Sequence, residues 1–148
     1  MRITLLFLPL FCVLMGTCWA KNIEFGTEEH TFILSIPDTY KEEPLPHGFE
    51  VTKQDSDAVL VASALNNEEL PFQLLHQIIP SRLRMNSVKK RERMDDVFIS
   101  GTRDGEPLFI RFFLINDCLL SFVAVGFERK EFDYIMQSLE EVTIEESE

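Results

Sequence analysis

The sequence predicts an α+β fold, in which a single domain has a largely antiparallel six-stranded sheet with helices packed on it, in the order β-β-β-α-β-β-β-α. Three observations lead to this class. Apolar residues alternate along several short runs, as they do in strands with one buried face. Pairs of these runs are joined by short polar turns, which favours antiparallel neighbours. Two longer stretches have apolar residues at the period of a helix.

The first half of the chain after residue 20 contains three predicted strands. In "HTFILSIP", Phe32, Leu34 and Ile36 occupy alternate positions, and Pro37 ends the run. The segment "DTYKEEPLPHG" contains two prolines and a glycine and is predicted to be a loop. "FEVTK" and "AVLVASAL" flank the polar turn "QDSD" and are predicted to form a hairpin.

A helix is predicted after this hairpin, in "NNEELPFQLLHQII". Phe72, Leu75 and Ile79 fall on one helical face. Pro71 suits the first turn, and Pro80 is expected to end or kink the helix.

The second half of the chain contains three more predicted strands and a final helix. The strands are "DVFISGT", "PLFIRFFLI" and "CLLSFVAVGF", and Asp104-Gly105 and Asn116-Asp117 are the hairpin turns between them. The last segment, "ERKEFDYIMQSLEEV", is predicted to be an amphipathic helix. Its apolar face consists of Phe132, Ile135, Met136 and Leu139.

The N-terminus predicts export. Residues 1–20 begin with a basic residue, continue with an apolar run and have small residues towards the end, which is the pattern of a signal peptide. We expect cleavage near Ala20 and a protein that is periplasmic or secreted. Lipid attachment at Cys18 is the alternative. Residues 21–148 then form the single predicted domain, with a short acidic tail, "EESE".

The charge of the chain indicates which kinds of partner it can bind, and its cysteine content indicates whether it can form an internal disulfide. Removal of the leader takes away Arg2, so the formal net charge of −11 would fall by one to −12. This acidic balance argues against general nucleic-acid binding, which needs positive charge against the phosphates, and it favours a basic or neutral partner. Two of the three cysteines also lie in the leader, so Cys118 has no partner for an internal disulfide.

Cys118 is predicted to be a buried residue rather than a nucleophile. A two-residue turn at Asn116-Asp117 pairs Ile115 with Cys118, and both faces of this hairpin are apolar, as expected for a central hairpin covered by helices on both sides. A catalytic thiol needs a lowered pKa, whereas the adjacent carboxylate of Asp117 would raise it. A free thiol for an intermolecular bond is the alternative.

The sequence contains no other constellation for chemistry. His30, His47 and His76 have no pair at the spacing of helical metal ligands. The nucleophile elbow, the phosphate-binding loop and the dinucleotide glycine pattern are missing. Asp95 and Asp96 are adjacent, but neighbours on a strand point to opposite faces, which favours a solvated turn over a cation site. We therefore predict no catalytic, cofactor-binding or metal-binding residues.

The order of elements, with "FILSIPDTY" near the start and "EFDYIMQSLEEV" at the end, resembles the PsbP-like superfamily. This superfamily includes the extrinsic PsbP protein of photosystem II, a Ran-binding import factor and bacterial DcrB-like periplasmic relatives. The residues that carry the resemblance are Ile36, Pro37, Tyr40, Phe132, Ile135, Ser138 and Leu139. Tyr40 stands where the family more usually has tryptophan. The resemblance implies a fold and a non-enzymatic role in binding or assembly, and it transfers no ligand residue.

Three functions remain open from the sequence. The first, which the missing catalytic set favours, is an exported, non-catalytic binding or assembly module of the cell envelope with a protein partner. The second is an inhibitor or immunity-type protein that neutralises a toxin or hydrolase in the envelope. The third is an enzyme that uses scattered acids such as Glu50 and Asp96.

A basic segment, "SRLRMNSVKKRER", stands out in this acidic chain, with six basic residues and one acidic residue. One interpretation is a solvated connection between helix and sheet. The other is a docking loop for an anionic surface, either the acidic patch of a partner protein or membrane head groups. No aromatic residue is interleaved, which disfavours single-stranded nucleic acid. The candidate docking residues are Arg82, Arg84, Lys89, Lys90, Arg91 and Arg93.

Overall fold

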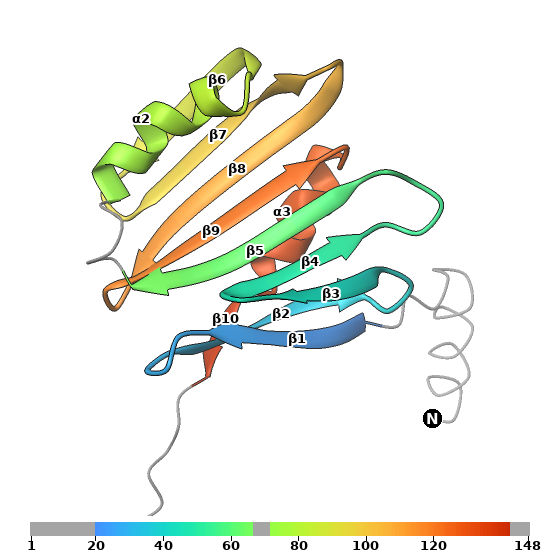
Figure 1. Cartoon of the computed structure of the whole chain (residues 1–148), viewed down its shortest axis with the longest axis vertical. Helices are drawn as coiled ribbons and strands as arrows, with labels where there is room; N and C mark the ends of the chain where they lie inside the picture. Colours follow the sequence, from blue (N-terminus) through green and yellow to red (C-terminus); the bar gives the residue numbers. More distant parts are fainter. Residues whose placement is uncertain (1–19, 67–71, 143–148) are drawn as a thin grey trace, which may run out of the picture.

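The computed structural model describes residues 20–66 and 72–142 of the chain. Within these residues there are two antiparallel sheets and two helices (Figure 1). The predictions for the leader, for Pro71 and for the acidic tail lie outside the described residues. The elements are β1 (Ala20–Gly26), β2 (Thr31–Pro37), β3 (Lys41–Leu45), β4 (Gly48–Thr52), β5 (Val59–Asn66), α2 (Phe72–Arg82), β6 (Asn86–Arg93), β7 (Asp96–Arg103), β8 (Glu106–Ile115), β9 (Cys118–Val125), α3 (Arg129–Gln137) and β10 (Glu140–Val142).

The larger sheet has seven strands in the order β3-β4-β5-β9-β8-β7-β6, and the smaller sheet has three strands in the order β1-β2-β10. Every strand pair in both sheets is antiparallel. The predicted α+β class with a six-stranded sheet is therefore wrong. The described chain is mostly β, and the predicted element order lacks β1, β3, β6 and β10.

Strands β3 and β6 fall in segments that the sequence assigns to a loop and to a charged connection. Every residue of both strands is exposed, so neither strand has the apolar face that periodicity detects. Both strands lie at the edges of the seven-stranded sheet. Backbone pairing with the neighbouring hairpin strand, β4 or β7, holds each of them in the extended state.

The remaining two errors, at β1 and β10, have other causes. Strand β1 does alternate, with Ile23 and Phe25 buried, but it begins at the predicted end of the leader. Strand β10 occupies the part of the chain that the sequence assigns to the end of the last helix. Helix α3 stops earlier because Ser138 caps it and also binds β2: the Ser35 N–H donates to Ser138 Oγ at 2.9 Å.

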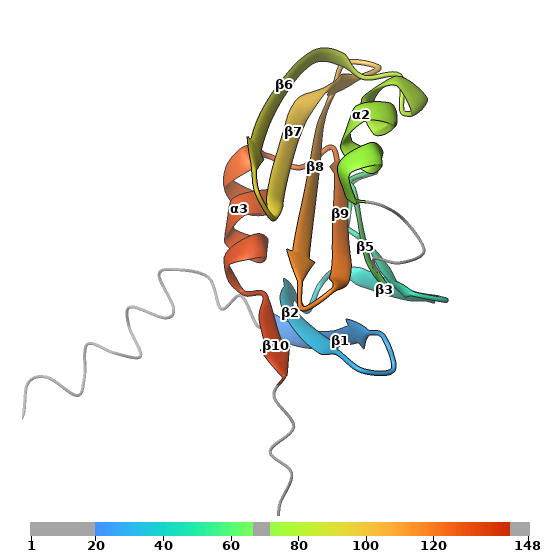
Figure 2. The ribbon, with the colours of Figure 1, turned by 90° about the vertical axis from the view of Figure 1, so that its left-hand side faces the viewer.

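One face of the seven-stranded sheet, here called the α3 face, is covered by α3 and by the three-stranded sheet (Figure 2). The fully buried ring of Phe132 on α3 packs against Phe98 of β7 and Phe109 of β8, with ring centres 6.2 and 5.6 Å away. On the other half of this face, Phe25 of β1 packs against Phe49 of β4 at 5.4 Å. Aromatic burial of this kind holds both layers to the sheet.

The opposite face, here called the α2 face, is covered by α2 over its β7–β8–β9 part. Phe72 is buried there, and Leu75 and Ile79 pack beside it, as the predicted helical face requires. The helix continues through Pro80 to Arg82, so Pro80 does not end it. Neither helix in the part of the chain that the structure describes is long and apolar enough to cross a membrane.

The two predicted hairpin turns are confirmed. Asp104 and Gly105 have φ angles of 51° and 82°. Asn116 and Asp117 have φ angles of 48° and 62°. Two successive left-handed residues make the tight turn that matches the twist of antiparallel strands. The resulting register pairs β8 with β9 at Ile115 and Cys118, as predicted.

Candidate functional site

The six candidate docking residues separate into two groups in the structure. Arg82 and Arg84 lie at the end of α2. The other four lie on β6, which is the outer strand of the seven-stranded sheet next to β7. These four are Lys89, Lys90, Arg91 and Arg93. The predicted docking loop is therefore an edge strand.

Arg82 and Arg84 have a local role at the helix end. Arg84 has a φ of 54°, and its backbone N–H donates to Ser81 O at 3.2 Å. The next N–H, that of Met85, donates to Pro80 O at 3.0 Å. These two bonds form a Schellman motif, in which a left-handed residue follows the last helical turn. Arg82 lies where positive charge complements the helix dipole. We therefore assign both residues to the end of the helix and not to the docking surface.

The register of β6 against β7 shows to which face of the sheet each of the other four cations points. Arg91 lies opposite Phe98 on the α3 face, and residues two positions away on either side share that face. Lys90 points to the α2 face, where its Nζ lies 2.8 Å from Glu92 Oε1. The three cations on the α3 face, here called the basic row, are Lys89, Arg91 and Arg93.

Arg91 is held over an aromatic ring. Its guanidinium carbon lies 5.8 Å from the centre of the Phe98 ring, and the guanidinium carbon of Arg129 on α3 lies 4.2 Å from the same centre. Phe98 is 6% exposed, so the protein core fixes the position of the ring. A cation–π contact orients a guanidinium and leaves its N–H groups able to donate. Arg129 therefore adds a second oriented guanidinium beside the basic row.

Two acids on the same face already have partners. Asp96 accepts two hydrogen bonds from Arg111, at 3.1 and 2.9 Å. Asp133 lies 3.0 Å from Arg129. Among the residues that the structure describes, no carboxylate lies within ion-pair distance of the basic row. The cations of the basic row therefore have no ion-pair partner among these residues, although Asp96, which is paired with Arg111, lies directly opposite Arg93 in the register.

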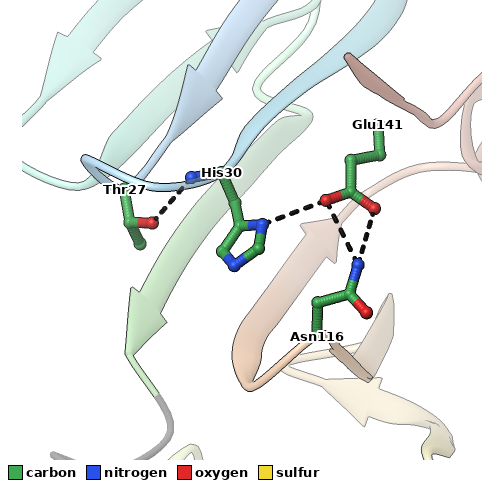
Figure 3. A network of polar contacts seen from close by, with 4 residues as sticks. All are labelled: Thr27, His30, Asn116 and Glu141. Atoms are coloured by element: carbon green, nitrogen blue, oxygen red, sulfur yellow. Dashed lines mark hydrogen bonds and ion pairs between the residues drawn. The ribbon is translucent and has the colours of Figure 1, made fainter. Parts of the chain in front are cut away.

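A polar pocket of about 670 Å³ lies where the β1–β2 turn, the end of β5 and the β8–β9 turn meet. His30 Nδ1 lies 3.0 Å from Glu141 Oε1, and Asn116 Nδ2 donates to Glu141 Oε2 at 3.1 Å (Figure 3). The His30 N–H donates to Thr27 Oγ1 at 3.2 Å. Glu141 of β10 thus ties the two turns together, which is a structural role.

The fold brings His47 to the same pocket as His30, although the two lie apart in the sequence. His76 lies on α2. Over residues 20–66 and 72–142, no group of three or more histidine, cysteine, aspartate or glutamate residues is arranged to hold a metal ion. The pocket therefore gives no basis for assigning a metal centre.

Cys118 lies at this pocket and is only 1% exposed. The prediction of a buried cysteine is confirmed. Burial, and to a smaller extent the charge of Glu141, raises the pKa of the Cys118 thiol. The acid that contributes is thus Glu141 rather than the neighbouring Asp117. A raised pKa favours the protonated thiol, which is the opposite of what a nucleophile needs.

A second hollow, of about 760 Å³, lies between the end of β2 and α3. Ile36 and Tyr134 contribute to its walls. Glu131 in the same wall lies 2.7 Å from Lys53 Nζ and accepts a hydrogen bond from the Tyr40 hydroxyl at 3.3 Å. These contacts satisfy the charge of Glu131 and hold α3 to the sheets.

The two acids of the enzyme hypothesis do not meet. Glu50 lies on β4 and Asp96 on β7, and three strands, β5, β9 and β8, separate them in the sheet. Asp96 is also occupied by Arg111. The structure does not bring these carboxylates into one site.

Sequence reasoning found the cations of the basic row but missed Phe98 and Arg129. No local pattern connects β6, β7 and α3, because α3 reaches Phe98 through tertiary packing, such as that of Phe132 on the sheet. Comparison with known proteins adds no role for any of these residues, since no family model and no curated protein matches the chain.

Proposed function

We propose that this protein is an exported, non-catalytic binding or assembly module of the cell envelope, and that it binds an anionic partner protein through the basic row. One observation carries the proposal. Three cations stand in line on an edge strand without an ion-pair partner among the described residues, in a chain whose formal net charge is −11. Asp96 and Asp133, which lie on the same side of the sheet, are paired.

The electrostatics favour an oriented encounter. A protein that is negative as a whole repels an anionic partner except where a positive patch faces it. Complementary patches of this kind raise the association rate and select the orientation of the two proteins. The basic row is such a patch, and the binding it supports is expected to weaken as salt screens the charges.

The row is also ordered before binding. Strand β6 is paired with β7 from Lys89 to Arg93, so its backbone does not have to be immobilised by the partner. The contact of Arg91 with Phe98 further restricts one of the two arginine side chains of the row. Ordering groups in advance lowers the entropy cost of association.

Two further features support the export and the non-catalytic role. Strand β1 begins at Ala20 and pairs with β2, so cleavage near Ala20 would leave the rest of that strand in place. The raised pKa of Cys118 and the double contact of Asp96 with Arg111 leave both groups poorly suited to chemistry.

The test replaces all three residues of the basic row by serine. Each cation near an anionic surface contributes about 1 kcal/mol, so the loss of three should weaken partner binding by roughly a hundredfold. The measurement is crosslinking to proteins of the envelope fraction at low and high salt, with thermal unfolding to check the fold. A matched control removes the same charge from exposed positions elsewhere: Lys41→Ser, Arg82→Ser and Arg103→Ser.

Crosslinks that disappear in the basic-row variant and persist in the control support the proposal. Equal loss in both variants would show that net charge alone matters. Crosslinks that persist in the basic-row variant would reject the docking surface.

A further inference from the structure

We infer that the anionic partner offers the basic row an extended segment with a carboxylate at every second residue. This inference rests on the proposed function, and it adds the conformation and the charge spacing of the partner.

The spacing of the basic row follows from the strand that carries it. Strand β6 pairs with β7 in regular register from Lys89 to Arg93, and the one irregularity lies before Lys89. Side chains two residues apart on a strand are separated by about 6.7 Å. The three cations therefore span about 13 Å in a nearly straight line.

An extended partner segment repeats this spacing, because its own side chains alternate with the same period. Carboxylates on alternate residues of such a segment meet all three cations at once. In a helix, residues four apart are about 6 Å apart along the axis, but each such step also turns the side chain by about 40°. A third carboxylate on a helix would therefore leave the line.

The contacts of the side chains on β6 also indicate which face of this strand the segment occupies. On the α2 face, Lys90 is paired with Glu92, so no row of unneutralised cations forms there. On the α3 face, Arg91 is oriented by Phe98, whereas Arg129, which contacts the same ring, already donates to Asp133. A guanidinium oriented in this way can donate two parallel hydrogen bonds to one carboxylate. The segment thus lies along β6 on the α3 face.

A narrow segment fits this surface better than a flat membrane does. Asp95 follows the basic row in the β6–β7 turn, and Glu128 precedes Arg129, and both are exposed. A membrane of anionic lipid that contacted the row would also bring its head groups near these carboxylates, whereas a single extended chain can avoid them. Like charges brought together in this way oppose binding.

The experiment compares two capped seven-residue peptides of identical composition, each with three glutamates and four threonines. In one peptide the two residue types alternate, and in the other the glutamates are contiguous. Titration of the exported protein, followed by NMR at low salt, gives the affinity and the residues that shift. We expect the alternating peptide to bind roughly tenfold more tightly, with shifts centred on the basic row. The preference should vanish when the basic row is replaced by serine and survive in the control variant at Lys41, Arg82 and Arg103.

Other outcomes separate this inference from the proposed function. If both peptides bind equally and both depend on the basic row, the protein does not distinguish between the two spacings of the glutamates. The inference then fails and the proposed function stands. If neither peptide binds while envelope crosslinks still depend on the basic row, the partner offers a folded surface, and again only the inference fails. If vesicles of anionic phospholipid bind through the basic row and the peptides do not, the partner is a membrane and both statements are overturned.

Discussion

The two edge strands of the seven-stranded sheet, β3 and β6, are both fully exposed and highly charged, but their charges are satisfied differently. On β3, Lys41 Nζ lies 2.9 Å from Glu43 Oε1, and Glu42 lies 3.8 Å from Lys21. Strand β3 also contains Pro44, which has no N–H for pairing. On β6, the basic row has no carboxylate partner among the described residues.

This difference separates two uses of charge on a sheet edge. Charged residues and proline on an edge prevent the strand from pairing with other chains, and the paired charges of β3 are sufficient for that purpose. A row of like charges without partners also prevents pairing with another copy of itself. In addition it attracts an acidic partner, which a neutralised edge does not. The number of charges is thus a weaker indicator of function than whether they are paired.

The largest expected effect comes from a substitution in the core beneath the basic row, and not from a substitution in the row itself. Phe132 is fully buried against Phe98 and Phe109, so Phe132→Ala should cost about 3 kcal/mol of unfolding free energy. Because α3 carries Arg129, amide exchange should rise at β6 and β7 more than at β3. Denaturant unfolding and hydrogen exchange measure this. Tyr134→Ala, on the same helix but 75% exposed, is the control and should be nearly neutral. A neutral Phe132→Ala would mean that α3 is detachable.

A pair of single substitutions compares the two edges directly. Arg91→Ser on β6 should weaken binding of the anionic partner about fivefold, which corresponds to about 1 kcal/mol. Lys41→Ser on β3 removes the same charge and should leave binding unchanged, because Lys41 is already paired with Glu43. Titration with the alternating peptide measures both. Equal effects of the two substitutions would remove the distinction between the edges.

Cys118 lies at the centre of the sheet, since β9 is the fourth of the seven strands. It therefore serves as a reference site away from the two edges. Its pKa is raised in the folded protein, so the unfolded chain loses the thiol proton first as pH rises. Stability should therefore be constant well below the unfolded thiol pKa of about 8.5 and should fall as pH rises beyond it. Denaturant unfolding at neutral and alkaline pH should show this fall in the native protein and not in Cys118→Ala.

The same burial makes two further results expected for Cys118. Alkylation should be slow in the folded protein and fast in denaturant, and neither Arg91→Ser nor Lys41→Ser should change the folded rate. Cys118→Ser should cost on the order of 1 kcal/mol because a buried hydroxyl needs a hydrogen-bond partner. Equal alkylation rates in the folded and unfolded states would show that the thiol is accessible.

The smallest expected effect concerns β3, the edge strand on which Lys41 and Glu43 are paired. The hydrogen bond to Glu43, and then the charge of that residue, raises the pKa of Lys41 above its ordinary value. Glu43→Gln removes the charge, so the pKa of Lys41 should fall back towards the ordinary lysine value. NMR titration of the lysine side chains measures this, with Lys41 of the unsubstituted protein as the reference. An unchanged Lys41 pKa would mean that β3 is not neutralised in solution.

Particular residues show where sequence reasoning succeeded and where it failed. The register of β8 and β9 was predictable because the Asn116-Asp117 turn determines it locally, and the burial of Cys118 follows from that register. Strands β3 and β6 were not predictable because pairing with a neighbouring strand, rather than an apolar face, makes them extended. The end of α3 depends on Ser138 binding Ser35 of β2, a contact between residues that lie 103 positions apart in the sequence.

The sequence by itself determined the elements whose apolar residues repeat with a clear period, the tight turns between them, and the concentration of basic charge in one short segment. Those features are local, so composition and spacing are enough to reveal them. Only the tertiary structure decided which cations share a face, which of them are neutralised, and that Arg91 and Arg129 meet over Phe98. These properties depend on strand register and on the packing of α3 against the sheet, which bring together residues far apart in the chain.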